Sequence, residues 1–313
     1  MIRTHVVEEN SQLKEGGVAV AIAFSGTYRW IDIEAQTPED MAWLGENFRF
    51  HPLALEDCLH LDQRPKMEEY EDSLFIVVHA FSTAAGELEV HELHTFVMSK
   101  LLVTVHADPL PAVDAVRARL RREPEHLTKG PDALLHLLLD AVTETHSPVI
   151  EELQDRLDTL EEELLSSPTK TLLEGLFDLR KKLVLLRRAV APTRDMLLSL
   201  SRNERIHAGI APYFRDVYDH VHRAVEEIDS ARDMLNDILA AYHSEVAHRT
   251  NVVMKRLTLF SALLLPLTFI TGFFGMNFTG IPYDDPGMLL AAFAAIIVLP
   301  AATVASFRLL RWI

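Results

Sequence analysis

The chain has 313 residues and a formal net charge of −16, a length that allows one globular domain together with a membrane part. The acidic balance argues against nucleic acid as the main partner and favours a protein that attracts cations. The single cysteine, Cys58, excludes a disulfide framework within the chain and a zinc module built from several cysteines.

Residues 1–125 are expected to form a mixed α/β domain. Short runs rich in β-branched and aromatic residues are typical of strands, and they occur at 18–24, 28–33, 74–81, 93–98 and 101–105. Thr37 precedes Pro38 and two acidic residues, which predicts a helix start with Thr37 as its cap. Residues 1–9 are polar and acidic rather than a secretory signal, so we expect this domain in the cytosol.

Residues 126–208 are expected to form a cytosolic, amphipathic helical region. Apolar residues recur at three- and four-residue spacing from Pro131 to Leu165, with dense charge between the leucines of the second half. This spacing predicts one long amphipathic helix whose charges form a solvated face. Residues 166–169 contain a proline that breaks the pattern, and a second helix is expected to follow to about Leu200.

Residues 209–275 are predicted to form one long helix. No helix-breaking residue occurs between Pro212 and Pro266. A continuous helix from Pro212 to Gly275 would be about 95 Å long. Because this length greatly exceeds a bilayer, we expect a cytosolic stalk that continues into a membrane span and acts on it as a lever.

Two uncharged segments are long enough to cross a bilayer, one from Leu257 to about Phe274 and one from Met288 to Phe307. Residues 276–287 are the predicted loop, and residues 288–313 the second span with a short C-terminus. Basic residues flank the cytosolic ends of both spans, whereas the loop has none. The positive-inside bias therefore predicts a multi-pass protein of the plasma membrane with both termini in the cytosol and the loop outside.

Polar residues of the first span fall on one face. On a helical projection, Asn251, Thr258, Ser261 and Thr268 lie within an arc of roughly 100°. Met254, Leu265 and Gly272 share this arc. Polar groups that face lipid are costly, so such a stripe either packs against other helices or lines a pore. Since one helix cannot enclose a pore, the second interpretation requires a ring of subunits.

Several motifs in order along the chain resemble the CorA family of divalent-cation transporters. Gly275-Met276-Asn277 follows the first apolar span, and further matching blocks lie at 51–57, 63–66, 212–220, 251–258 and 266–272. The resemblance implies a funnel-shaped homopentamer, with an α+β cytosolic domain, long helices and two transmembrane helices in each subunit. It also implies a transporter of divalent cations in a lipid bilayer with no cofactor beyond the ion. An enzyme is not expected, because the sequence has no phosphate loop, nucleophile motif or His-Glu-x-x-His zinc site.

The resemblance also assigns roles to single residues. Gly275, Met276 and Asn277 are expected to select the hydrated ion through neutral oxygens, because Mg²⁺ holds its water tightly. The remaining pore residues divide into apolar gates and polar rings, and they are Met254, Leu257, Leu265, Asn251, Ser261 and Thr268. Acidic residues of the loop, Asp284 and Asp285, are expected to concentrate cations at the entrance. A regulatory metal site is expected at Asp216, with Asp219 and His220 beside it, although Ala84 stands where the family has a partner carboxylate and Glu87 and Glu89 lie close in sequence.

Two departures from the family pattern leave the transported ion open. Phe274 replaces a tyrosine before the Gly-Met-Asn motif, and Gly280-Ile281-Pro282 stands where magnesium transporters carry Met-Pro-Glu-Leu. Gly-Ile-Pro resembles the zinc-transporting ZntB branch of the same superfamily. The first hypothesis is passive conduction of Mg²⁺, with Co²⁺ and Ni²⁺ as further ions. The alternative is a zinc transporter of the ZntB type, with or without proton coupling.

Overall fold

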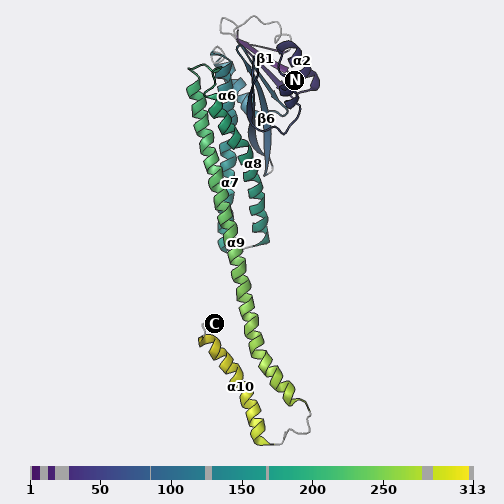
Figure 1. Cartoon of the computed structure of the whole chain (residues 1–313), viewed down its shortest axis with the longest axis vertical. Helices are drawn as coiled ribbons and strands as arrows, with labels where there is room; N and C mark the ends of the chain where they lie inside the picture. Colours follow the sequence, from purple (N-terminus) through teal and green to yellow (C-terminus); the bar gives the residue numbers. More distant parts are fainter. Residues whose placement is uncertain are drawn as a thin grey trace. The chain divides into compact units, whose positions relative to one another are not determined.

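The fold was determined as a computed structural model and contains two compact units, residues 1–238 and 239–313. It describes residues 2–7, 13–17, 28–84, 86–123, 129–166, 169–276 and 285–309. The first unit contains a sheet and helices, and the second contains two apolar helices (Figure 1). The predicted strand at 18–24, Asn277, Asp284 and the Gly-Ile-Pro segment lie outside the described residues.

The first unit is built around one mixed sheet of seven strands in the order β2-β1-β3-β7-β6-β5-β4. The strands are β1 (Ile2–Val7), β2 (Leu13–Gly16), β3 (Tyr28–Glu34), β4 (Lys66–Glu69), β5 (Leu74–Ala84), β6 (Glu87–Met98) and β7 (Leu101–His106). β3 pairs with β7 in parallel, and the other described pairs are antiparallel. The predicted strands at 28–33, 74–81, 93–98 and 101–105 are confirmed, whereas the polar strands β1, β2 and β4 were missed.

Two short helices cover one face of this sheet. Helix α2 (Pro38–Phe48) begins with the predicted cap, because Asp40 N donates to Thr37 Oγ1 at 3.2 Å and Asp40 accepts from Thr37 N in return. Helix α3 (Pro52–Asp57) follows. Their apolar residues join those of β3, β5, β6 and β7 in one core that includes Met41, Leu44 and Cys58. Burial raises the pKa of the Cys58 thiol, so this cysteine is an inert part of the core.

A buried polar network fastens the parallel pair of β3 and β7. Asp32 is fully buried and accepts hydrogen bonds from Thr104 Oγ1 at 2.6 Å, His106 Nε2 at 3.1 Å and Arg117 Nη2 at 2.6 Å. Trp30 Nε1 donates to the Thr104 hydroxyl at 2.9 Å. Burial alone would raise the pKa of Asp32, but its hydrogen bonds to His106 and Thr104 outweigh burial and lower it. The network therefore holds a carboxylate inside the sheet domain.

Helices α4 (Pro111–Arg122) and α6 (Pro131–Thr143) pack against each other, and α6 lies against the sheet. The prediction of one helix from 131 to 165 was wrong, since α6 ends at Thr143 and α7 (His146–Ser166) begins after a turn. Thr145 Oγ1 donates to Val142 O at 2.6 Å and accepts from Phe81 N at 3.0 Å. The second of these hydrogen bonds joins the turn to a strand distant in sequence and stabilises the break between the two helices.

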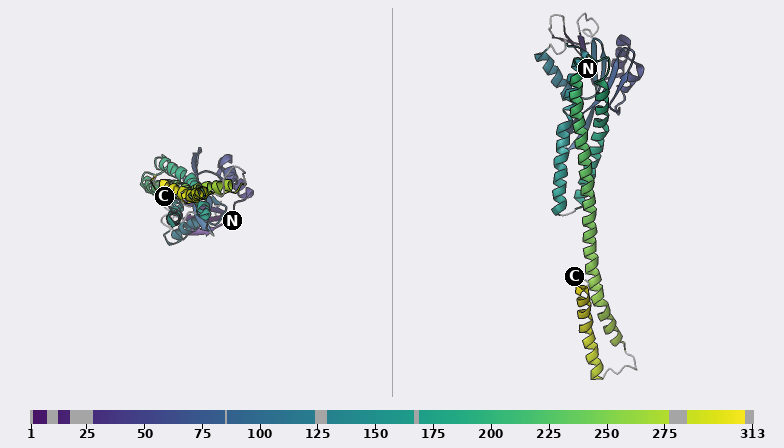
Figure 2. Two further views of the ribbon diagram at one scale, coloured as in Figure 1. Left: turned by 90° about the horizontal axis from the view of Figure 1, so that it is seen from below. Right: turned by 60° about the vertical axis from the view of Figure 1, so that its left-hand side comes forward.

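Helix α8 (Lys170–Leu200) starts at the cap residue Thr169 and packs on α7. Helix α9 (Ala211–Phe274) has 64 residues, which confirms the predicted long helix. Within the first unit, α7, α8 and the beginning of α9 run side by side (Figure 2). The buried residues of α9 extend from Phe214 to Ile238, and no described residue beyond Ile238 is buried.

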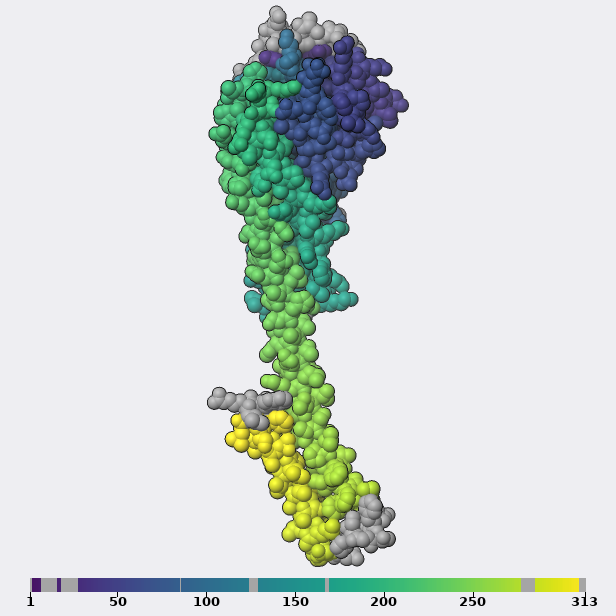
Figure 3. Space-filling model, in the orientation of Figure 1, coloured from purple at the N-terminus to yellow at the C-terminus, as the bar shows by residue number. Residues whose placement is uncertain are grey.

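The second unit contains the last part of α9 and helix α10 (Pro286–Leu309). Both helices are long and apolar enough to cross a membrane, with mean hydropathy of 2.0 and 2.4 over their most apolar windows. None of the described side chains of this unit is buried within the chain, and the visible face of α9 in this unit is uncovered (Figure 3). Such helices need an apolar solvent, other helices or both.

Candidate functional site

The predicted polar stripe lies on the side of α9 that α10 leaves open. Its members are all exposed, namely Asn251, Met254, Thr258, Ser261, Leu265, Thr268 and Gly272. Within residues 259–274 the partly covered positions recur at three- and four-residue spacing, at 259, 262, 263, 266, 267, 270 and 274. On a helical projection the centres of these two faces are about 150° apart.

The covered face of α9 is the one that meets α10. A cavity of about 350 Å³ lies between the two helices and is lined on one side by Ile270 and Phe274 and on the other by Met288 and Phe293. Pro266 on this helix has no backbone N–H, so the carbonyl of Ala262 lacks its usual helical donor. Because α10 approaches only the apolar side of α9, the stripe remains available to another molecule.

The threonine hydroxyls of the stripe have their donors committed within the helix. Thr258 Oγ1 donates to Met254 O at 2.9 Å, and Thr268 Oγ1 donates to Leu264 O at 2.8 Å. A hydroxyl in this arrangement has no free donor and offers only oxygen lone pairs outward. Hard cations such as Mg²⁺ and their bound waters favour such oxygen acceptors.

Apolar side chains alternate with the polar ones along the same helix, so that each kind occupies its own heights, or levels, along the helix axis. Met254, Leu257 and Leu265 are 54%, 58% and 71% exposed, which is high for large apolar side chains. Met254 and Leu265 are separated by about 16 Å at 1.5 Å per residue. The open face therefore alternates between apolar levels and oxygen-bearing levels.

Gly275, the first residue of the Gly-Met-Asn motif, follows α9 and lies close to the backbone of the last turn of this helix. Gly275 N donates to Thr271 O at 2.9 Å, and a Cβ at position 275 would lie 3.0 Å from the same carbonyl oxygen. A side chain at this position would require that carbonyl to move by a few tenths of an ångström. At Gly272, one turn earlier, a Cβ would meet nothing within 4 Å. The next residue, Met276, is described and exposed, whereas Asn277 is not described.

Asp285 has a contact that the sequence did not predict. Its Oδ1 accepts from Gly287 N at 3.1 Å, and its backbone oxygen accepts from Met288 N at 3.1 Å. An acidic residue at this place caps the first turn of α10 and interacts favourably with the helix dipole. One oxygen of the expected entrance acid is therefore used at the start of the helix.

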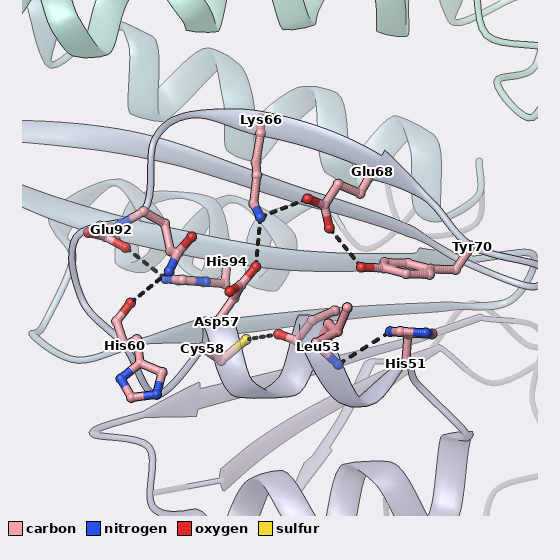
Figure 4. A network of polar contacts seen from close by, with 12 residues as sticks. His51, Leu53, Asp57, Cys58, His60, Lys66, Glu68, Tyr70, Glu92 and His94 are labelled. Carbon is pink, nitrogen blue, oxygen red and sulfur yellow. Dashed lines mark hydrogen bonds and ion pairs between the residues drawn. The ribbon is translucent and has the colours of Figure 1, made fainter.

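An ion pair in the first unit joins two of the motifs that match the family, the blocks at 51–57 and 63–66. Lys66 Nζ lies 2.7 Å from Asp57 Oδ2 and 2.8 Å from Glu68 Oε1, and Tyr70 donates to Glu68 at 2.7 Å (Figure 4). Burial and the neighbouring Glu68 raise the pKa of Tyr70 to about 12. Asp57 ends the block at 51–57 and Lys66 ends the block at 63–66, so these motifs have a structural role. Their pairing was missed because sequence separation alone does not show which charges meet.

The residues expected to sense metal do not form a site within one chain. His220 Nε2 lies 4.0 Å from Asp216 Oδ1, and their side chains are 50% and 70% exposed. Asp219 lies one residue before His220 on the same helix. Within the described parts of the chain, no three His, Cys, Asp or Glu residues are arranged to hold a metal ion.

Comparisons with known proteins agree with this geometry. The family model described as CorA-like Mg²⁺ transporter protein matches residues 25–309. The cobalt/magnesium transport protein CorA of Thermotoga maritima is 36% identical over 90% of this chain and 82% of its own. The zinc transport protein ZntB of Yersinia enterocolitica is 27% identical over 89% of this chain and 85% of its own. A solved structure, the complete CorA magnesium transporter from Methanocaldococcus jannaschii, superposes with a TM-score of 0.85 at 23% identity and covers 100% of this chain and 99% of that one.

Proposed function

The chain belongs to the CorA family of divalent metal cation transporters, which are membrane proteins and not enzymes, and we propose that it conducts hydrated Mg²⁺ through a homopentameric pore. The observation that carries this proposal is the stripe on α9 that α10 leaves open. Polar groups on this face would be costly in lipid, and they are useful around water.

Several copies of α9 are needed to enclose a pore. Each subunit contributes one open stripe, and rotational symmetry brings equivalent stripes to a common axis. The number of five comes from the likeness to the family. In this arrangement α10 covers the outer face of α9, and the apolar residues of α10 contact lipid.

The path of the ion follows from the orientation of the helices. We place residues 209–275 as a cytosolic stalk that continues into the pore, residues 276–287 outside, and residues 288–313 as the second span with its end in the cytosol. Lys255 and Arg256 before the first span support this orientation. The membrane potential then drives entry by about 4.6 kcal/mol per 100 mV for a divalent ion, twice the value for a unit charge.

Selection occurs at the outer end of the pore. In our proposal Gly275, Met276 and Asn277 present neutral oxygens to the hydration shell of the ion, and Asp284 and Asp285 raise the local cation concentration. The crowding at Gly275 supports this, because a side chain there would press against Thr271 O and require a small local shift. Neutral oxygens can bind a hydrated ion without removing its water.

Gating occurs at the apolar levels of the stripe. Rings of Met254, Leu257 and Leu265 can close the pore by excluding water, while Ser261 between them and Asn251 and Thr268 at either side hold the ion. The committed threonine donors support passage of cations, since the outward lone pairs attract positive charge. For regulation, we propose that Asp216, Asp219 and His220 bind an ion together with groups of a neighbouring subunit.

A second candidate is zinc transport of the ZntB type. The Gly280-Ile281-Pro282 segment favours it, and a ZntB protein is among the relatives. Co²⁺ and Ni²⁺ remain further candidate ions for the first mechanism. The intact Gly275-Met276-Asn277 motif favours Mg²⁺ over zinc.

Ion flux into proteoliposomes tests the proposal. Uptake of Mg²⁺, Co²⁺ and Zn²⁺ is compared with and without a pH gradient, and cobalt hexaammine is added as a mimic of the hydrated ion. We expect Mg²⁺ uptake that ignores the pH gradient and is blocked by the mimic. Asn277→Ala should abolish this flux while native mass spectrometry still finds pentamers. Uptake of zinc alone, or a wild-type protein that is only monomeric or dimeric, would contradict the proposal.

A further inference from the structure

Helix α7 carries a line of acidic side chains, and these have no partner within the described chain. They are spaced at i, i+4, i+7 and i+11 and lie within an arc of about 60°, and we call them the acidic stripe: Glu151, Asp155, Asp158 and Glu162. All are exposed, opposite the buried leucines of the same helix. Two neighbouring acids on the same helix do have partners within the chain. Glu152 accepts a hydrogen bond from Thr83 at 2.9 Å, and Glu163 pairs with Arg156 at 3.5 Å.

Helix α8 carries the opposite charge on its outer side. Its exposed residues at matching spacing combine cations with apolar groups, and we call them the basic stripe: Phe177, Arg180, Lys181, Val184 and Arg188. Phe177 is 52% exposed and Val184 is 41% exposed. In the described residues, none of the three cations has a hydrogen bond or ion pair. The cations beside them are paired, because Lys182 contacts Asp178 at 2.7 Å and Arg187 contacts Asp229 at 2.7 Å.

The two stripes lie at the same level along the antiparallel pair of helices. A Cβ built on Gly175 of α8 lies 3.1 Å from a methyl group of Leu160 and 3.7 Å from Arg156 Nη2 of α7. Counting back from this contact places Asp155 and Asp158 opposite the segment from Phe177 to Arg180. Each stripe points away from the buried face of its own helix. Apart from Arg188, which borders a cavity with residues 61–65, a single chain leaves both stripes unused.

We propose that the acidic stripe of α7 in one subunit docks against the basic stripe of α8 in the next. This inference rests on the proposed pentamer and specifies one of its contacts. A rotation about an axis parallel to α7 and α8 keeps every residue at its level along these helices, so two complementary stripes at the same level meet without a shift along that axis. Two different faces that bind each other form a closed ring when the rotation between neighbours closes, with each face used once per subunit.

The combination of charge and apolar area favours a protein partner over free cations. Like charges at i, i+3 and i+4 along the acidic stripe destabilise the isolated helix, and three opposite charges on a neighbour relieve this. A cation bound to the carboxylates would also relieve it, but it would leave Phe177 and Val184 exposed. A second copy of the chain accounts for both stripes at once.

Carboxyl-to-amine cross-linking of the full-length protein in detergent tests the contact between subunits. One tagged subunit has its acidic stripe neutralised by Glu151→Gln, Asp155→Asn, Asp158→Asn and Glu162→Gln, and it retains Lys181. A second, differently tagged subunit retains the acids and carries Lys181→Arg. Neither subunit can form the cross-link within itself or with its own kind. We therefore expect peptides that join residue 181 to the acidic stripe only when both subunits are co-expressed.

Absence of this cross-link from co-purified mixed pentamers would overturn the inference while leaving the proposed pentamer intact. A wild-type protein without pentamers would instead contradict the proposed function. Charge reversal supplies a second measurement. Reversing the acidic stripe to lysine should lower the pentamer fraction on dilution, and adding Arg180→Glu, Lys181→Glu and Arg188→Glu to the same chain should restore it, because every contact between neighbours is then complementary again. An unchanged pentamer fraction in the reversed protein would also contradict the contact.

Discussion

His146 should make the first unit sensitive to acid. Its side chain is 1% exposed, and its Nε2 donates to the backbone oxygen of His79 at 3.0 Å. The other ring nitrogen, Nδ1, is buried without a hydrogen-bond partner among the described residues. Burial is the main reason that the pKa of His146 is lowered from 6.5 to about 4, since a proton on Nδ1 would place a charge where no acceptor exists.

The sign and size of the effect follow from this shift. The unfolded chain binds a proton at His146 below pH 6.5, and the folded chain resists it until about pH 4. The stability that neutral His146 contributes is therefore fully present above pH 6.5 and is lost as the pH falls toward 4. Integration gives a loss of about 2 kcal/mol at pH 5 and about 3 kcal/mol at pH 4.

Urea unfolding of the full chain in detergent measures this loss. The fluorescence of buried Trp30 reports on the first unit. His146→Gln is the comparison, because glutamine can still donate to His79 and does not titrate. We expect the free energy of unfolding to fall between pH 7 and 5 by about 2 kcal/mol more in the wild type than in the variant. Equal pH dependence in the two proteins would refute the reasoning.

The acid sensitivity of the first unit also affects how coupling of ion flux to protons must be tested. His79 and His136 also have a lowered pKa because of burial, so their effect has the same sign. His106 acts in the opposite direction, since burial is outweighed by its hydrogen bond to Asp32 and its pKa is raised. A flux that changes when the N-terminal unit is exposed to pH 5 can therefore reflect partial unfolding. Coupling of ion flux to protons is therefore tested with a pH gradient in which the side that contains the N-terminal unit stays near pH 7.

Three further substitutions test the pore and the fold. Met254→Ala should widen an apolar ring and raise the leak of ions in liposomes, whereas Phe260→Ala, outside the stripe, should leave it unchanged; equal leak in both would contradict the gate. Gly275→Ala should reduce flux in assembled pentamers because its Cβ would crowd a carbonyl at 3.0 Å, and Gly209→Ala, outside the stripe, is the control with nothing within 4 Å. Asp32→Asn should lower the free energy of unfolding by about 3 kcal/mol, as measured in urea, because the buried Arg117 loses one of its two carboxylate partners and keeps Asp114; a loss below 1 kcal/mol would show that the network is not a buried ion pair.

Local patterns were predictable from the sequence. The Thr37 cap depends on residues within one turn, and the capping box is present in the structure. The long helix α9 was predicted because no helix-breaking residue occurs between Pro212 and Pro266. In the structure the helix also continues through Pro266. The stripe was also predicted, since helical periodicity places Thr258 and Thr268 on one face. The structure adds that α10 leaves this face open, which periodicity alone does not show.

Contacts between distant segments were not predictable. The break before His146 depends on Phe81, 64 residues from Thr145 in the chain. The strand β4, with Lys66 in its first position, was missed because three of its four residues are charged and it lies at the edge of the sheet. The roles of Asn277 and of the regulatory acids remain predictions, because they concern a loop that is not described or a site shared between subunits.

The end of burial at Ile238 has a consequence for how the protein is made. The first unit is complete at residue 238, and the second comprises residues 239–313. At about 5–20 residues per second, the ribosome needs roughly 4–15 s to add these residues. A mixed α/β unit commonly folds within milliseconds to seconds. The first unit can therefore fold, and present both charged stripes, before the two apolar helices have been synthesised in full.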